Sequence, residues 1–196
     1  MLAQLRASIV TMALFTLVFG LAYPLAMTGV AGVLFPDQAS GSLVKDAGGH
    51  LIGSSLIAQG FAKPEYLHPR PSAAGNGYDP MNSSGSNLGP MDPALAKRMA
   101  GDAAAIRKDT PNAVIPADAL TTSGSGLDPD VSPANAAMQA PRIAAARHLT
   151  PSVVQAVIDA ETGQPFLGFV GQPHVNVLAV NRALDARYPV AQPKPS

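Results

Sequence analysis

The sequence predicts an α+β fold in which a single N-terminal transmembrane helix precedes one mixed soluble extracytoplasmic domain. No charged residue lies between Arg6 and Asp37, and the rest of the chain mixes short helix and strand patterns without βαβ alternation. The 18 Gly and 19 Pro among 196 residues predict many turns, and this length leaves room for one domain after the helix. We expect a cytoplasmic segment 1–6, a transmembrane helix 7–35, an α+β domain 36–188 and a Pro-rich tail 189–196.

The uncharged run after Arg6 is long enough to cross a bilayer, which takes roughly 20 apolar residues. A cleaved signal peptide is the alternative, but its apolar region usually has about 7 to 15 residues, so we favour a retained anchor. Pro24 and Gly29 lie inside the run, where neighbouring helices can satisfy the freed backbone groups. The sequence therefore predicts an anchor that packs against other membrane helices.

The charges that flank the anchor predict its orientation. Arg6 and the terminal amine precede it, whereas Lys45 on the other side is offset by Asp37 and Asp46. Because positive residues stay preferentially on the cytoplasmic side, the N-terminus is expected in the cytoplasm and the main domain in the periplasm of a bacterial inner membrane.

The composition argues against several classes of function. Lys plus Arg and Asp plus Glu both number 13, so the net charge is zero and no nucleic-acid partner is implied. The chain has no Cys, which removes disulfides, Cys-based zinc sites and thiol nucleophiles. The histidines show no ligand spacing, so no metal site is expected: His50, His68, His148 and His174.

The local patterns predict the following elements. Gly-bounded 51–58 indicates a strand, and the Pro- and Gly-rich stretch 61–92 indicates a long ordered loop. Asp92 followed by Pro93 starts a helix to Pro111 with Leu95, Met99 and Ile106 on one face. Later elements are a helix 135–149 capped by Ser132 and kinked or split at Pro141 near Ala140, and a helix that starts at Thr150 and ends just before Gly163. A strand 166–170 and a helix 175–188 follow.

One segment, 121–139, runs from small residues into a predicted helix N-terminus, where backbone N–H groups can cradle a phosphate. It matches neither a Walker A motif nor G-x-G-x-x-G. From the residues alone we favour a tight turn in which Asp128 and Ser132 cap local backbone. Gln139 and Arg142 share one helix face, with Arg147 further round, which predicts a solvated or partner-facing polar surface.

Two functions of other classes stay open on the residues. A membrane-anchored envelope serine hydrolase would use Ser125 or Ser123 with His148, although G-x-S-x-G is not present around Ser125. A free-standing ligand-binding domain is the second alternative.

Four runs occur in this order along the chain: Gly53–Ala73, Ser84–Pro90, Ser-Gly-Ser-Gly-Leu-Asp-Pro from Ser123, and Val175-Asn176-Val177-Leu178. Together they resemble the KdpC subunit family of the bacterial potassium-transporting Kdp P-type ATPase, and with the anchor the similarity covers nearly the whole chain. The departures are small: Ser84 stands where the family often has Gly, and Asp130 and Val131 where other residues are common.

The resemblance implies a non-catalytic accessory subunit of an ATP-driven, high-affinity potassium import complex. The implied partners are an ATP-hydrolysing P-type subunit, a channel-like potassium-binding subunit and the lipid bilayer, and the Asp-Lys-Thr-Gly motif of the hydrolysing subunit does not occur here. It also implies a catalytic chaperone that raises ATP affinity, with ATP as the ligand of Ser123, Gly124, Ser125, Gly126 and Gln139. The expected orientation instead places Gln139 outside the cytoplasm, where ATP is scarce, so a role in stabilising the assembly or shaping the outer potassium entrance stays open.

Overall fold

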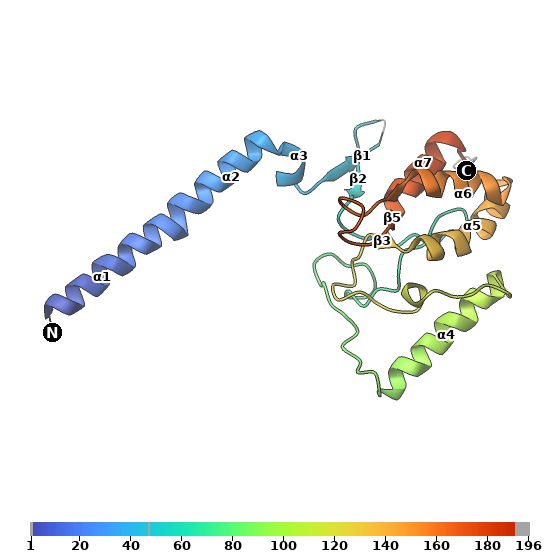
Figure 1. The fold of residues 1–196 in the computed structure, drawn as a ribbon, viewed down its shortest axis with the longest axis horizontal. Helices are drawn as coiled ribbons and strands as arrows, with labels where there is room; N and C mark the ends of the chain where they lie inside the picture. Colours follow the sequence, from blue (N-terminus) through green and yellow to red (C-terminus); the bar gives the residue numbers. More distant parts are fainter. Residues whose placement is uncertain (1, 47, 191–196) are drawn as a thin grey trace, which may run out of the picture. The chain divides into compact units, whose positions relative to one another are not determined.

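The computed structural model describes residues 2–46 and 48–190 and divides into two compact units, Met1–Ser54 and Ser55–Ser196 (Figure 1). A long apolar helix comes first, and short helices and small sheets follow, which confirms the α+β class with a single-helix anchor. Residues 191–196 of the expected Pro-rich tail lie outside the described residues.

The first unit consists mainly of one helix, Leu2–Leu34, and no other described helix is long and apolar enough to cross a membrane. It comprises α1 (Leu2–Leu17), a π-helical turn η1 (Val18–Ala22) and α2 (Tyr23–Leu34). The Tyr23 N–H donates to the Val18 carbonyl, one residue further back than in an α-helix. Pro24 explains this wider turn, because proline has no N–H and its ring collides with the carbonyl four residues earlier.

A short helix and a hairpin complete the first unit: α3 (Pro36–Ala39), β1 (Leu43–Lys45) and β2 (Leu51–Ser54). The two strands are antiparallel, with Val44 opposite Gly53. The predicted strand 51–58 is therefore too long. Residues 55–57 turn the chain, and the Ala58 N–H donates to the Leu127 carbonyl at 2.9 Å instead of continuing the ladder.

Helix α4 (Pro93–Asp109) follows a segment, residues 55–92, with no helix or strand, as the prolines predict. The Asp92 carboxylate accepts from the Ala94 N–H at 2.8 Å, which confirms the predicted N-cap. Ala103 is the buried residue of α4, while the predicted apolar face is half-buried. After a 3-10 turn, η2 (Ala117–Ala119), the chain reaches the second sheet.

Helix α5 (Pro133–Arg147) is continuous, so the expected split at Pro141 does not occur. Ser132 accepts from the Asn135 N–H at 3.1 Å, which confirms its cap, and His148 ends the helix in the left-handed region rather than Leu149. Helix α6 (Pro151–Ala160) begins after Thr150, as expected, but the Thr150 side chain forms no cap hydrogen bond.

Three strands form the second sheet in the order β3-β5-β4, all antiparallel: β3 (Asp130–Val131), β4 (Thr162–Gly163) and β5 (His174–Asn176). Helix α7 (Val177–Arg187) follows β5 directly, so the predicted helix 175–188 begins two residues too early. The predicted strand 166–170 is wrong. A tight turn takes its place, because Gly168 adopts a φ of +80° and the Phe166 and Val170 backbones bond to each other.

The core of the second unit lies among α5, α6, α7 and the sheet, where α5 packs on α6 and α6 on α7 (Figure 1). Leu67, from the irregular segment, is fully buried in the same cluster. The other buried members are Val131, Ala136, Ala140, Ile143, Ala144, Val154, Val157, Ile158, Val175, Val177, Val180 and Leu184.

Candidate functional site

The segment Pro64–His68 has no regular structure, yet two amide side chains hold its backbone as a neighbouring strand would. Asn181 on α7 accepts from the Leu67 N–H at 2.7 Å and donates to the Leu67 carbonyl at 2.9 Å. Gln139 on α5 accepts from the His68 N–H at 2.9 Å and donates to the His68 carbonyl at 3.1 Å. Both backbone groups of two consecutive residues are thereby satisfied, which allows this polar segment to be buried.

Two arginines extend the same arrangement toward Pro64. Arg142 donates to the Pro64 carbonyl and, at 3.1 Å, to the Tyr66 carbonyl. Arg147, whose side chain is fully buried, donates to the Glu65 and Tyr188 carbonyls and pairs with the Asp185 carboxylate at 2.7 Å. We call these four side chains, together with Asp185, the polar clamp: Gln139, Arg142, Arg147, Asn181 and Asp185.

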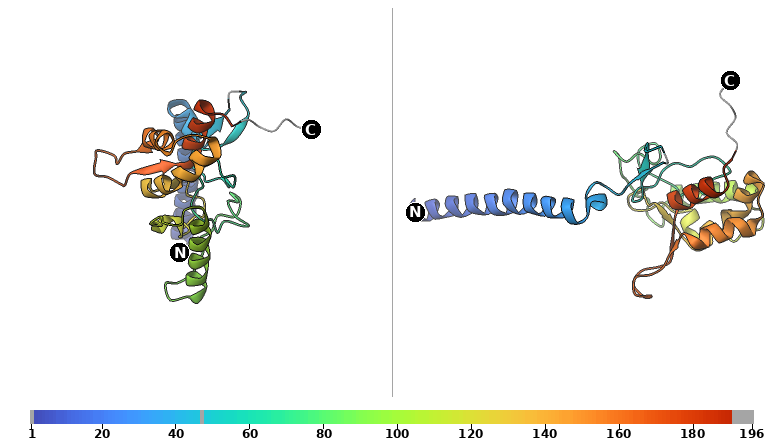
Figure 2. Two further views of the ribbon diagram at one scale, coloured as in Figure 1. Left: turned by 90° about the vertical axis from the view of Figure 1, so that its right-hand side faces the viewer. Right: turned by 90° about the horizontal axis from the view of Figure 1, so that it is seen from above.

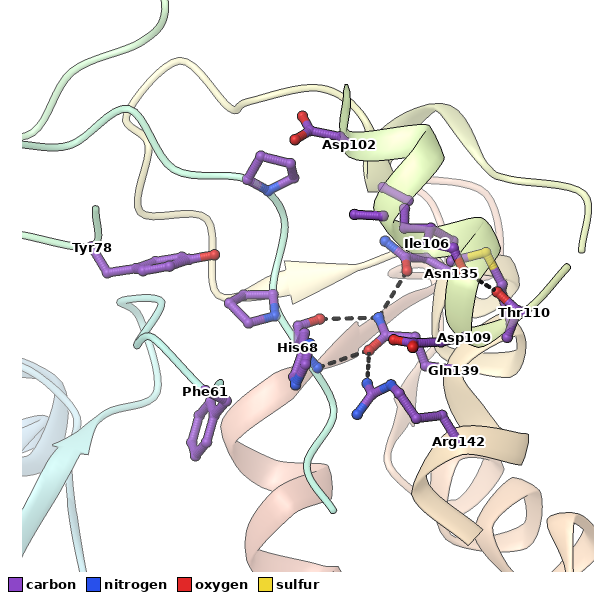
Figure 3. Close-up of a pocket in the computed structure, with 15 residues that line it drawn as sticks. Phe61, His68, Tyr78, Asp102, Ile106, Asp109, Thr110, Asn135, Gln139 and Arg142 are labelled. Atoms are coloured by element: carbon purple, nitrogen blue, oxygen red, sulfur yellow. Dashed lines mark hydrogen bonds between the residues drawn. The ribbon is translucent and has the colours of Figure 1, made fainter. Parts of the chain in front are cut away.

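The carboxamide of Gln139 has no free hydrogen-bonding position. Its oxygen accepts from His68 N–H and, at 2.7 Å, from Arg142, and its nitrogen donates to the His68 carbonyl and, at 2.9 Å, to Asn135 (Figure 3). An amide oxygen has two lone pairs and the NH₂ group two donors, so all four are used within the chain. A ligand that bonds Gln139 must therefore replace one of these contacts.

Gln139 also lines a cavity of about 340 Å³ between the segment Pro64–His68, α4 and α5 (Figure 3). Burial, with the nearby Arg142 charge, holds the pKa of His68 below its usual 6.5, against opposing contributions from the Lys63 carbonyl and Asp109. Burial raises the pKa of Tyr78. The walls combine aromatic, prolyl and charged groups: Phe61, His68, Pro69, Pro71, Tyr78, Asp102, Ala105, Ile106, Asp109, Thr110, Ala119, Asn135, Met138, Gln139 and Arg142.

The Ser123–Gly126 block does not line this cavity and packs instead against residues 83–85. The Ser84 N–H and the Ser83 hydroxyl both donate to the Ser125 carbonyl, at 2.9 and 3.0 Å. A Cβ on Gly126 would lie 2.5 Å from the Ser84 carbonyl oxygen, and Gly126 has a φ of +68°, so this position requires glycine. The block is therefore a close packing contact between two loops.

Asp128 and Asp118 stabilise the loops at the start of α5. Asp128 accepts from the Asp130 N–H, as the turn interpretation predicts, and forms an ion pair with Arg70 at 2.8 Å. Asp118 accepts from the N–H and hydroxyl of Ser132 and from Asn135. Burial opposes ionisation, but these donors hold the pKa of Asp118 below 3.8.

The structure separates the residues that the family resemblance groups as a nucleotide site, because of these five only Gln139 lines the cavity. The expectation that Gln139, Arg142 and Arg147 form a solvated or partner-facing surface is wrong, since they bond the segment Pro64–His68. Among the described residues, neither Ser123 nor Ser125 forms the hydrogen bond to His148 that a serine hydrolase would need. The Oγ atoms of the two serines lie 3.4 Å apart, and the Ser125 Oγ accepts from the Leu127 N–H.

Comparison of the sequence with known proteins identifies the family to which this chain is similar. The sequence model described as "KdpC: K+-transporting ATPase, c chain" matches residues 5–186. The chain belongs to the KdpC family. It is 66% identical to the "Potassium-transporting ATPase KdpC subunit" of Caulobacter sp. (strain K31), 64% to that of Caulobacter vibrioides (strain NA1000 / CB15N), each over 96% of both chains, and 56% to that of Beijerinckia indica over 98% of both.

The four KdpC-like runs now have places in the fold. The first supplies the clamped segment, the second and third pack together through Ser84 and Ser125, and the fourth joins β5 to α7 through Asn176. Asn176 caps α7 by accepting from the Ala179 N–H and also bonds the Ser55 carbonyl and Asp130. Helix periodicity places Asn181 on the inward face of α7, and a polar residue there is the signal that points to the clamp.

Proposed function

We propose that this chain is a non-catalytic accessory subunit that stabilises the assembly of an ATP-driven, high-affinity potassium import complex. The proposed partners are an ATP-hydrolysing P-type subunit and a channel-like potassium-binding subunit, because the relatives carry the name of a potassium-transporting ATPase subunit. The observation that carries the structural role is the polar clamp. Its polar groups bond the chain itself, so they stabilise the fold of the second unit instead of facing a substrate.

Copurification tests this role. A tagged chain, expressed with the other genes of the complex, is purified from membranes in mild detergent. We expect one large ATPase and one multispanning subunit to copurify in a constant ratio. A chain that purifies without them would contradict an assembly role, and labelling by a serine-directed covalent probe would favour the hydrolase instead. The Ser125→Ala variant is the control for that labelling.

We also propose that the N-terminus is cytoplasmic and that residues 55–190 lie in the periplasm. The uncharged helix and the preceding Arg6 support this orientation. The chain has no Cys, and Val114 is 91% exposed, so Val114→Cys gives one reactive reporter. A membrane-impermeant maleimide should label this variant in intact spheroplasts. Labelling that occurs only after lysis would place the domain in the cytoplasm.

The catalytic-chaperone role, in which the chain raises the ATP affinity of the hydrolysing subunit, is the second proposed function. One observation favours it: Gln139 lines a cavity whose walls include the rings of Phe61 and Tyr78, and aromatic rings stack on nucleobases. The saturated Gln139 amide and the packed Ser123–Gly126 block do not fit as open ligands, so the cavity walls would have to supply most of the contacts.

A cavity-filling variant separates the two functions without replacing any residue of the polar clamp. Ala105 on α4 lines the cavity, so Ala105→Trp reduces its volume, while Ala104→Trp on the exposed surface of the same helix is the matched control. Nucleotide binding in the cavity predicts a severalfold higher KM for ATP of the assembled complex with Ala105→Trp only. A purely structural role predicts an unchanged KM for both variants.

A further inference from the structure

The loop that joins β4 to β5 ends in an ordered turn that projects from the rest of the second unit in both views of Figure 2. The Phe166 N–H donates to the Val170 carbonyl at 3.0 Å and the Val170 N–H returns the bond at 2.9 Å. In addition, the Gly168 N–H donates to the Pro165 carbonyl, just before the pair, at 3.0 Å. The turn is therefore closed by its own backbone, although no other element in the described part of the chain covers it.

The side chains of this turn are large, apolar and exposed. Phe166, Leu167 and Phe169 are 70%, 71% and 77% exposed. Val170 is 50% exposed, so the two large side chains before Gly168 and the two after it all face solvent. We call residues 166–170 the apolar tip. Contiguous apolar surface on an ordered element marks an interaction site, because leaving it in water forgoes the free energy of burial.

The charge pattern argues against a lipid surface as the occupant. No Asp, Glu, Lys or Arg lies between Glu161 and Arg182, and the apolar tip contains neither Trp nor Tyr. Segments that bind membrane surfaces combine Trp, Phe or Leu on their apolar side with Lys or Arg for anionic headgroups. The apolar tip has the apolar residues but no Lys or Arg close to it in the sequence, and an uncharged apolar projection matches the fully desolvated centre of a protein interface.

The apolar tip alone is too small to hold two copies of this chain together. Four side chains bury a few hundred Å² at most, while a stable interface buries about 800 Å² on each partner. The apolar tip is therefore a local contact within a larger interface. Its closed turn lowers the entropy lost on docking, as expected of an anchor that enters a groove already formed.

We propose that the apolar tip inserts into an apolar groove on the extramembrane surface of another protein subunit of the same complex. The inference rests on the proposed accessory-subunit function and adds the contact through which the second unit binds its partner. Phe166 and Phe169 supply most of the buried area, because they are the largest side chains of the tip.

Cysteine labelling tests the proposal in the intact assembly. The chain has no Cys, so Leu167→Cys puts one reporter in the apolar tip and leaves both phenylalanines in place; Val114→Cys is the exposed control. The maleimide labelling rate of this chain's own gel band is measured in three samples. These are the chain alone in detergent, the chain alone in phosphatidylcholine–phosphatidylglycerol nanodiscs, and the whole complex in detergent.

We expect labelling of Leu167→Cys to slow about tenfold or more in the complex only, as for a side chain buried at an interface core, with Val114→Cys unchanged. Equal rates in all samples would overturn the proposal. Protection in nanodiscs alone would assign the apolar tip to lipid, and protection that grows with the concentration of the chain alone would assign it to a second copy. Failure of the proposed function would give a different result, because the unaltered chain would then copurify with no ATPase subunit.

A double variant checks the energetic role of the apolar tip. Phe166→Ser combined with Phe169→Ser should reduce recovery of the complex about tenfold, as for loss of interface anchors, while the Tm of the chain alone stays unchanged because both rings are exposed. Recovery equal to that of the unaltered chain would contradict the proposal. Met81→Ser combined with Met91→Ser, at side chains 87% and 91% exposed, is the control for loss of apolar surface elsewhere.

Discussion

The segment Pro64–His68 and helix α4 both line the cavity, but they are attached to the second unit by different means. The segment is irregular, yet Leu67 is fully buried and the polar clamp satisfies its backbone. Helix α4 is regular, yet Ala103 is its one buried residue. Regular secondary structure and attachment to the core are thus separate properties. We expect the segment to unfold only with the core and α4 to open first.

Removal of the Asn181 amide should weaken the attachment of the segment Pro64–His68 to the core, and we expect it to have the largest effect on stability. Asn181→Ala leaves the N–H and carbonyl of Leu67 buried without partners. Each such group costs about 1 to 3 kcal/mol, so we expect a loss of about 3 kcal/mol in the free energy of unfolding. Urea unfolding of the full chain in detergent, followed by circular dichroism, measures it.

The exposed Asn112→Ala is the matched control and should change stability by less than about 0.5 kcal/mol. An equally small effect for Asn181→Ala would show that the segment is not coupled to the core.

Much of this arrangement could not be predicted from the sequence, because its bonds join residues far apart in the chain. The helix starts at Asp92–Pro93 and Ser132–Pro133 follow from local capping, and both are confirmed. Asn181 and Leu67, by contrast, are 114 residues apart, and Gln139 and His68 are 71 apart. No local pattern encodes such pairs.

Pro141 also shows the limit of local sequence rules, because here a local rule predicts an interruption that the structure does not have. The local rule predicts a kink or a split, yet α5 runs through Pro141 as one helix, and Gln139 and Arg142 on either side of Pro141 bond the same segment. Strands of two or three residues, such as β3 and β5, are likewise too short for a period of two to show. Of the residues that the family resemblance implies as a nucleotide site, Gln139 lines the cavity and the Ser123–Gly126 block lies elsewhere, and nucleotide binding by any of them stays a prediction.

The Ser123–Gly126 block allows a test of its packing role, because its two glycines differ in their surroundings. Gly126→Ala forces a Cβ against the Ser84 carbonyl at a positive φ and should cost about 2 kcal/mol of unfolding free energy. Gly124→Ala has no atom within 4 Å of its Cβ and should cost less than about 0.5 kcal/mol. Equal costs would contradict the packing role of this block.

Truncation on α4 should have a smaller effect than either change. Ile106 is half-buried, so Ile106→Ala should cost about 1 kcal/mol, well below the cost of a fully buried isoleucine. Hydrogen exchange should show faster opening of α4 with little change in α5. The exposed Val114→Ala is the control and should leave both rates unchanged. Faster exchange throughout the unit would place α4 in the core.

The pH dependence of stability tests whether His68, in the cavity wall, is buried in the folded chain. We expect this effect to be the smallest. Burial and the Arg142 charge lower the pKa of His68 in the folded chain, so the unfolded chain binds the proton first as the pH falls through 6.5. Stability should therefore fall from about pH 7.5 to about pH 5.5. The loss should stop once the pH is below the folded pKa, where both states are protonated.

His68→Gln should reduce this fall, because the amide can still donate to the Lys63 carbonyl but takes up no proton. Unfolding measured between about pH 7.5 and about pH 8.5 is the control, since His68 is neutral in both states there. If the variant and the unaltered chain lose the same stability at low pH, His68 is exposed to water in the folded chain and the cavity wall is open. The segment Pro64–His68 would then be attached to the core as loosely as α4 is, in spite of the polar clamp.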